Sequence, residues 1–241
     1  MKARAIRLSA REAGAPTRAA CIARPRPYIG TMSTLASPAT PIRIDVWSDF
    51  VCPYCFIGAM RLDQLAQKHA IDPVWHAFML RPPGSPGMTA EKRAMIEAYT
   101  PRITAQIRDE FGLEMRRGPI GAQTFGAHHA MKHAGRHGKA LAFNEAMLRA
   151  YWLDGEDIGD REVLRRVGAT LDLAFDDEVL DGRDMATAEA VRTDLAQAHA
   201  YELHGVPAFI FSNRYLVSGA QPPEVFERAA RAAHESSVAL H

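Results

Sequence analysis

The chain has 241 residues, of which 47% are hydrophobic and 24% charged, a composition typical of a globular protein with one large domain or two small ones. Lys and Arg number 29 against 28 Asp and Glu, so the formal net charge is +1 and nothing in the charge favours nucleic acid or an anionic membrane as a partner. Three cysteines are too few for a secreted disulfide framework, and they leave a structural zinc site short of ligands.

The N-terminal stretch differs in composition from the rest of the chain. From Met1 to Pro41, Arg and Lys are scattered among Ala, Pro, Ser and Thr, and no apolar run is long enough for a signal peptide or a membrane span. We predict that residues 1–40 form a disordered extension, with a translation start at Met32 and an organellar transit peptide as alternatives. Cys21 is interpreted as an incidental free thiol, and we expect a cytoplasmic location.

The first predicted folding unit is strand, helix, strand. The apolar run Ile42–Trp47 indicates a strand, helical spacing indicates a helix from Pro53 to about His69, and Pro73–Phe78 indicates a second strand. Four aromatic side chains are expected in the core of the predicted sheet: Trp47, Trp75, Phe78 and Phe209.

The sequence Cys52-Pro53-Tyr54-Cys55 lies where the first strand passes into this helix. The spacing places two thiols one helical turn apart, with the first at the helix N-terminus, where unpaired backbone N–H groups and the helix dipole favour a thiolate. Pro53 fits the first helical position because its φ is already helical and its missing N–H is not needed there. We therefore predict a redox pair in which Cys52 is the nucleophile and Cys55 resolves a mixed disulfide.

A long helical region follows. A Pro- and Gly-rich stretch at residues 81–87 breaks regular structure, and no strand pattern appears again before about residue 180. The periodicity predicts a series of helices, the last with Asp160 as its N-cap: Thr89–Phe111, Phe125–His137, Lys139–Leu153 and Asp160–Leu171. Residues 85–183 are too many for a loop, so we predict an inserted helical subdomain that shapes the cleft beside the cysteines.

The C-terminal part returns to mixed α/β character. We predict a helix from about Asp184 to His204, ended by Gly205, because Gly commonly follows the last helical residue. A hairpin and a final helix complete the chain, at Ala208–Phe211, Tyr215–Ser218 and Pro222 to about His234.

This order of elements predicts an α/β protein with a thioredoxin fold. Residues 41–84 and 184–241 are expected to form the thioredoxin-like domain. The large α-helical insertion lies between its βαβ unit and its C-terminal ββα unit.

Three motifs resemble the DsbA-like thioredoxin-fold disulfide oxidoreductases, and in particular their FrnE-type branch: Ser48–Gly58, Gly205–Phe209 and Val217–Pro222. The resemblance extends from about Ile42 to Ala233. It implies a thioredoxin fold with a helical insertion, thiol–disulfide exchange, and a cis Val206–Pro207 bond packed beside the cysteine pair. A cis bond there is expected to present the Val206 backbone to an extended substrate peptide.

The expected site therefore combines Cys52 and Cys55 as catalytic residues with Val206, Pro207 and Tyr54 as substrate-binding residues. Tyr54 is expected to be partly exposed, and Cys52 to be exposed to substrate.

Pro53 and Asp49 are secondary candidates. Two interpretations of Asp49 stay open: it caps the turn into the helix, or it relays protons to Cys55. Asp45 is assigned no catalytic role, because strand alternation puts it on the face opposite Val46.

A predicted helix carries four histidines, and His129, His133 and His137 follow one another at i, i+4 and i+8, which is metal-ligand spacing. No Glu stands between them in the metalloprotease pattern, so we interpret them and His128 as surface or interface histidines and expect no metal.

The chain is thus expected to be a thiol–disulfide oxidoreductase that acts on protein or peptide disulfides, with no bound cofactor and with glutathione as a candidate redox partner. One alternative is a glutathione-dependent enzyme that resembles kappa-class glutathione transferases or hydroxychromene carboxylate isomerases, although these generally carry Ser at the position of Cys52. A redox-switched binding protein is a second alternative, and zinc held by the two cysteines with two histidines is a third.

Overall fold

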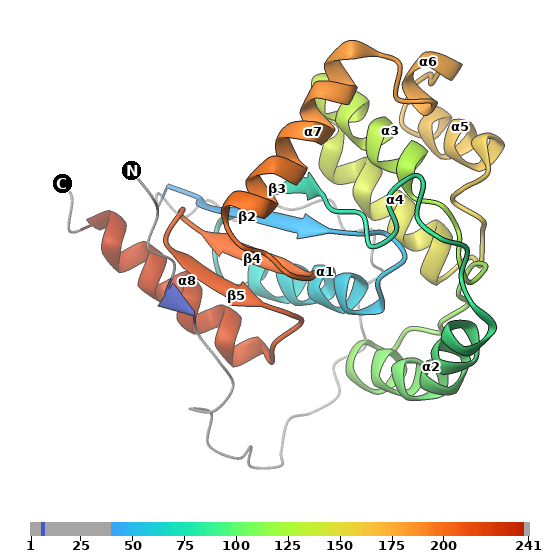
Figure 1. Cartoon of the computed structure of the whole chain (residues 1–241). Helices are drawn as coiled ribbons and strands as arrows, with labels where there is room; N and C mark the ends of the chain where they lie inside the picture. Colours follow the sequence, from blue (N-terminus) through green and yellow to red (C-terminus); the bar gives the residue numbers. More distant parts are fainter. Residues whose placement is uncertain (1–5, 8–39, 239–241) are drawn as a thin grey trace.

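The structure, a computed structural model, describes residues 6–7 and 40–238, and one mixed sheet with strand order β1-β5-β4-β2-β3 lies at its centre (Figure 1). Strand β3 is parallel to β2, β4 is antiparallel to β2 and β5, and the short β1 is parallel to β5. The strands are β1 (Ile6–Arg7), β2 (Ile42–Ser48), β3 (Ile71–Ala77), β4 (Ala208–Phe211) and β5 (Tyr215–Ser218). The β2–β3 and β4–β5 pairs have the predicted thioredoxin arrangement.

The predicted N-terminal extension, residues 1–40, lies almost wholly outside the described residues, and so do Cys21 and Met32. Its described part includes β1, whose two residues pair with Tyr215 and Leu216 of β5. The sequence did not predict this short strand.

Helices α1 (Pro53–Ala66) and α8 (Pro223–Val238) cover one face of the sheet, and α7 (Met185–Ala200) covers the other (Figure 1). The inserted region holds the remaining helices: α2 (Ala90–Phe111), α3 (Phe125–Arg136), α4 (Ala140–Trp152), α5 (Arg161–Ala169) and α6 (Asp177–Leu180). Of these, α2 stands apart from the others and lies beside α1 (Figure 1).

Side chains alternate between the two faces of β2. Ile44 and Val46 are fully buried in the core beneath α1 and α8, whereas Trp47 packs with apolar side chains of α7 and β4 on the opposite face. The larger core continues into the helical insertion, where the ring of Trp152 stacks on Phe56 of α1 at a centroid distance of 5.9 Å. The insertion therefore shares one apolar core with the sheet.

Several element boundaries differ from the prediction. Helix α1 ends at Ala66 rather than near His69, and α7 ends at Ala200 rather than at His204. The chain leaves α7 through Glu202, which has a positive φ of 55°, so Gly205 is not the residue that ends this helix. The short helix α6 was not predicted.

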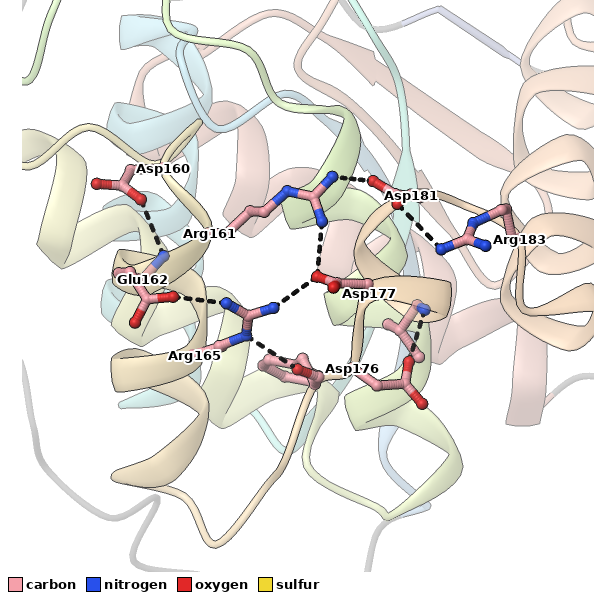
Figure 2. A network of polar contacts seen from close by, with 10 residues as sticks. Asp160, Arg161, Glu162, Arg165, Asp176, Asp177, Asp181 and Arg183 are labelled. Carbon is pink, nitrogen blue, oxygen red and sulfur yellow. Dashed lines mark hydrogen bonds and ion pairs between the residues drawn. The ribbon is translucent and has the colours of Figure 1, made fainter.

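An exposed network of ion pairs joins α5 to α6 (Figure 2). Arg161 pairs with Asp177 and Asp181, and Arg165 also pairs with Asp177, at 2.6 Å. The prediction that Asp160 caps α5 is confirmed, because its carboxylate accepts the N–H of Glu162 at 2.9 Å. Exposed ion pairs contribute little each, so we expect the network to add little to the stability of the fold.

A cluster of buried charged side chains lies between the sheet and α7. His76 sits between two carboxylates, with Nε2 2.8 Å from Asp45 and Nδ1 2.8 Å from Asp194. Asp194 also accepts the Ala77 N–H at 2.6 Å and pairs with Lys132 of α3. Strand β2, strand β3, α3 and α7 thus meet at one polar centre.

Both ring nitrogens of His76 face carboxylates, so both must donate, which makes the ring an imidazolium. Burial lowers the pKa of His76, but the hydrogen bonds to Asp194 and Asp45 outweigh it and the pKa is raised. Burial likewise opposes ionisation of Asp45, yet hydrogen bonds from His76 and Arg43 lower its pKa to about 2. The Trp47 ring stacks on His76 at 4.3 Å and shields the cluster.

In the described part of the chain, no helix has the length and apolar character needed to cross a membrane.

We predict that Asp194→Asn destabilises the fold by about 3–5 kcal/mol, because it leaves Lys132 buried without its charge partner and removes one of the two carboxylates that face His76. Urea unfolding followed by circular dichroism measures the loss. The matched control is Glu189→Gln on the exposed side of α7, which breaks a surface pair with Arg192 and should cost less than about 1 kcal/mol. Equal losses in the two variants contradict the role given to the cluster.

The contribution of this cluster should also depend on pH. The pKa of His76 is raised above 6.5, so its contribution is complete below 6.5 and is lost as pH rises through the folded-state value. The pKa of Asp45 is lowered from 3.8 to about 2, so its contribution is present above 3.8 and is lost as pH falls toward 2. The difference in unfolding free energy between wild type and Asp194→Asn is expected to shrink as the pH rises above 6.5, and an increase refutes this assignment.

Candidate active site

The turn from β2 into α1 puts the two cysteines at the start of the helix. The Cys52 N–H donates to the Asp49 carbonyl at 3.1 Å, and the Cys52 carbonyl accepts the N–H groups of Cys55 and Phe56 at 3.0 and 3.2 Å. Cys52 is therefore the N-cap residue in extended conformation, and Pro53 is the first helical residue, as predicted.

A close approach between α1 and β4 brings this turn to the loop before β4. A Cβ on Gly58 would lie 2.6 Å from the Phe209 ring and 3.3 Å from the Pro207 ring, so only glycine fits between them. The N-terminal turn of α1 consequently lies against Val206 and Pro207.

Cys52 has 6% of its surface exposed, so it is less accessible than expected, and its Sγ lies 3.6 Å from the Val206 carbonyl oxygen. The pKa of the Cys52 thiol is lowered because the Cys55 thiol donates to it and the backbone N–H groups of Cys55 and Tyr54 stabilise the thiolate. Burial and the charge of Asp49 oppose this effect. The helix start thus favours a thiolate at Cys52.

Cys55 lies one turn deeper and is only 1% exposed. Its sulfur accepts the Asp49 backbone N–H at 3.4 Å. Burial raises the pKa of the Cys55 thiol well above its usual value, and the hydrogen bond to Cys52 acts in the same direction. The two sulfurs therefore differ strongly in acidity, and Cys52, the more exposed of the two, is the more acidic.

The Val206–Pro207 peptide bond is cis, the form that the family resemblance implies. Pro207 is buried and Val206 half-buried, and the Pro207 carbonyl accepts the Gly219 N–H at 2.8 Å. The loops on either side of the β4–β5 hairpin are thereby tied together beside Cys52.

Tyr54 is 38% exposed, in agreement with the expectation for a residue between the two cysteines. Its hydroxyl lies 2.9 Å from that of Tyr99 on α2, and this hydrogen bond raises the pKa of Tyr54. The Arg102 guanidinium lies over the Tyr99 ring, 5.5 Å from its centroid. An aromatic pair thus joins α2 of the insertion to the first turn of α1.

Asp49 does not cap α1, so that interpretation is wrong. Its Oδ2 accepts the Leu80 N–H at 2.8 Å, and no side chain caps the helix start. The carboxylate is 1% exposed, and its Oδ1 lies 3.4 Å from Nε2 of His128, which is equally buried. The turn before the cysteines therefore contacts α3 of the insertion.

The histidines of α3 are not all at the surface. His128 and His129 are buried: the His128 ring lies 5.0 Å from the Phe50 ring, and the His129 ring lies 4.4 Å from the ring of Phe125, one turn earlier on α3. Across residues 40–238, no three His, Cys, Asp or Glu side chains are grouped so that they could hold a metal ion. The positions of His128 and His129 are therefore explained by their packing in the protein core.

Three contacts of the site were missed by the sequence analysis: those of His128, Tyr99 and Trp152. The Trp152 Nε1 donates to the Phe50 carbonyl at 2.8 Å and so holds the turn before Cys52. All three side chains come from the helical insertion, and their positions depend on tertiary packing that residue spacing does not encode.

The fold and the site define a thioredoxin-fold protein with a dithiol at the N-terminus of a buried helix and a cis-proline loop beside it. The chain belongs to the family of the DSBA-like thioredoxin domain, whose model matches residues 43–231. The family places the chain among the DsbA-like disulfide oxidoreductases. Its assignment to the FrnE-type branch stays a prediction.

Solved structures share the fold of this chain. A probable DsbA oxidoreductase from Streptomyces coelicolor is 27% identical, with 80% of this chain and 89% of that chain covered and a TM-score of 0.65. A 2-hydroxychromene-2-carboxylate isomerase has the same fold at 18% identity. The match covers 83% of this chain and 99% of that chain, with a TM-score of 0.65. The cytosolic disulfide reductase DsbM of Pseudomonas aeruginosa, solved with GSH, is 18% identical. The match covers 81% of this chain and 98% of that chain, with a TM-score of 0.55.

We predict that the two thiols react at very different rates. In a Cys21→Ser variant, iodoacetamide should modify Cys52 first, with a pH midpoint below the usual value of 9.0, because the Cys52 thiolate is stabilised. Cys55 should remain unmodified over the same period, because burial raises its pKa and limits access. Peptide mass spectrometry measures both rates, and equal modification of the two cysteines contradicts the assignment.

Proposed function

We propose that this protein catalyses thiol–disulfide exchange through Cys52 and Cys55. The observation that carries the proposal is the asymmetry of the pair. The Cys52 sulfur, the more exposed of the two, lies at the start of α1 and has a lowered pKa, whereas the Cys55 sulfur one turn deeper has a raised pKa. This asymmetry matches the different needs of an attacking thiolate and a resolving thiol.

In the first step, the Cys52 thiolate attacks one sulfur of a substrate disulfide. A Cys52–substrate disulfide forms, the substrate S–S bond breaks, and the other substrate sulfur leaves as a thiolate. In the second step, Cys55 loses its proton and attacks Cys52. The Cys52–Cys55 disulfide forms, the second substrate sulfur is released, and the substrate has gained the two electrons that the pair has lost. The reverse sequence oxidises a dithiol.

Backbone groups beside Cys52 are suited to hold an extended substrate. The Val206 carbonyl oxygen already lies 3.6 Å from the Cys52 sulfur, and Val206 precedes strand β4. A peptide that pairs with this residue by strand addition would pass directly over the reactive sulfur. Tyr54 offers an exposed aromatic surface next to that path.

Protein or peptide disulfides are therefore the proposed substrates, and glutathione is the proposed candidate for a redox partner. The structure of DsbM with GSH supports a glutathione partner, because it has the same fold. Its description as cytosolic also supports a cytoplasmic setting, in which such a pair is kept largely reduced.

Two substitutions test the proposal. Cys52→Ser should reduce turnover of a peptide with one internal disulfide to the uncatalysed rate, because the attacking thiolate is lost. Cys55→Ser should accumulate a mixed disulfide between Cys52 and the peptide, because nothing resolves it. Mass spectrometry of acid-quenched reactions detects the adduct.

Cys21→Ser is the matched control, since it removes a thiol outside the motif and should keep the wild-type rate. Wild-type turnover in Cys52→Ser refutes the proposed function.

A further inference from the structure

The second step of the proposed exchange needs a group that accepts the Cys55 proton. Cys55 is 1% exposed, so bulk water does not reach its sulfur directly. Burial also raises the pKa of this thiol well above its usual value. A buried acceptor close to the sulfur would allow the proton to leave as the new disulfide forms.

The residue whose backbone contacts the Cys55 sulfur carries a buried carboxylate. Asp49 donates its N–H to Cys55 at 3.4 Å, and its side chain is shielded from solvent. One carboxylate oxygen, Oδ2, accepts the Leu80 N–H. The other, Oδ1, has no hydrogen-bond partner and lies 3.4 Å from the His128 Nε2.

His128 is also buried and unpartnered. It is 1% exposed, and neither of its ring nitrogens has a hydrogen-bond partner. Its distance to Asp49 is longer than an ordinary N–H···O bond, so the two side chains are in contact but not fully bonded. Buried polar groups left in this state cost about 1–3 kcal/mol each, so a structural role alone explains them poorly.

We propose that Asp49 and His128 form a buried proton-holding pair that takes up the Cys55 proton when Cys55 resolves the mixed disulfide, and returns it in the reverse step. This inference rests on the proposed function and assigns the proton acceptor of its second step. The proton passes from the Cys55 thiol to the pair and then to the departing substrate thiolate. His128 acts through Asp49 and is therefore a positioning residue supplied by the helical insertion.

Two other titratable groups near the pair, Tyr151 and His129, do not take this role. Burial raises the pKa of Tyr151, on α4, to about 12, and burial lowers the pKa of His129, the neighbour of His128, to about 4. Neither group changes charge near neutral pH. Arg81, beside Leu80, donates to the Gly121 carbonyl instead.

Asp49 also acts on the attacking thiol. The negative charge of Asp49 raises the pKa of Cys52, which opposes its thiolate. Proton uptake by the pair removes this charge. The pair therefore couples the state of Cys55 to the reactivity of Cys52.

The test follows the two steps separately in the full chain with Cys21→Ser. A chromogenic aromatic disulfide releases one coloured thiolate when Cys52 attacks and a second when Cys55 resolves the mixed disulfide. Asp49→Asn and His128→Gln should each slow the second release by about a hundredfold and move its pH dependence to higher pH, because general acid–base assistance is lost. The first release should be unchanged in His128→Gln and faster in Asp49→Asn.

His129→Gln is the matched control, since it alters the adjacent buried histidine and should leave both releases within about twofold of wild type. If Asp49→Asn does not fold, His128→Gln decides the matter alone, with folding checked by circular dichroism. Wild-type rate and pH profile of the second release in the folded variants overturn the inference. A wild type that releases only one thiolate overturns the proposed function instead.

Discussion

The site depends on the way a buried helix begins at Cys52. Because α1 packs against β4 through Gly58, its first turn is pressed against Val206 and Pro207, and Cys52 comes to lie at the helix N-terminus beside a backbone carbonyl. The same geometry carries Cys55 one turn deeper, where it is almost fully buried. Two chemically identical side chains thereby acquire opposite shifts in pKa, and the proposed attack by Cys52 and resolution by Cys55 depend on this difference.

The helical insertion takes part in the site. Trp152 of α4 holds the Phe50 carbonyl, His128 of α3 contacts the Asp49 carboxylate, and Tyr99 of α2 contacts Tyr54. On the opposite face of the sheet, Lys132 of α3 pairs with Asp194 of α7, which also binds His76. The insertion is thus linked to the sheet by polar contacts on both sides of β2, in addition to a shared apolar core. The position of the site is therefore set jointly by both parts of the chain.

The sequence predicted the order of elements and the strand-to-helix position of the cysteines, because hydrophobic periodicity and the Cys-x-x-Cys spacing are local signals. It did not separate His128 from the other histidines of α3, since residues at helical spacing look alike until the packing of Phe50 on one side is known. The role of Asp49 was misjudged for a similar reason: a residue just before a helix often caps it, but here the Asp49 Oδ2 accepts the N–H of Leu80, 31 residues away, and not an N–H of α1. Long-range contacts of this kind are decided by the tertiary fold.

The reduction potential of the Cys52–Cys55 pair tests the central claim most directly. Purified Cys21→Ser protein is equilibrated in glutathione buffers of graded ratio, and alkylated thiols are counted by mass spectrometry. A working dithiol predicts a reversible two-electron transition at a potential in the range of roughly −270 to −120 mV that related dithiols span. If no disulfide forms between the two cysteines at any ratio, or if Cys52 only takes up a single glutathione, the dithiol account is contradicted.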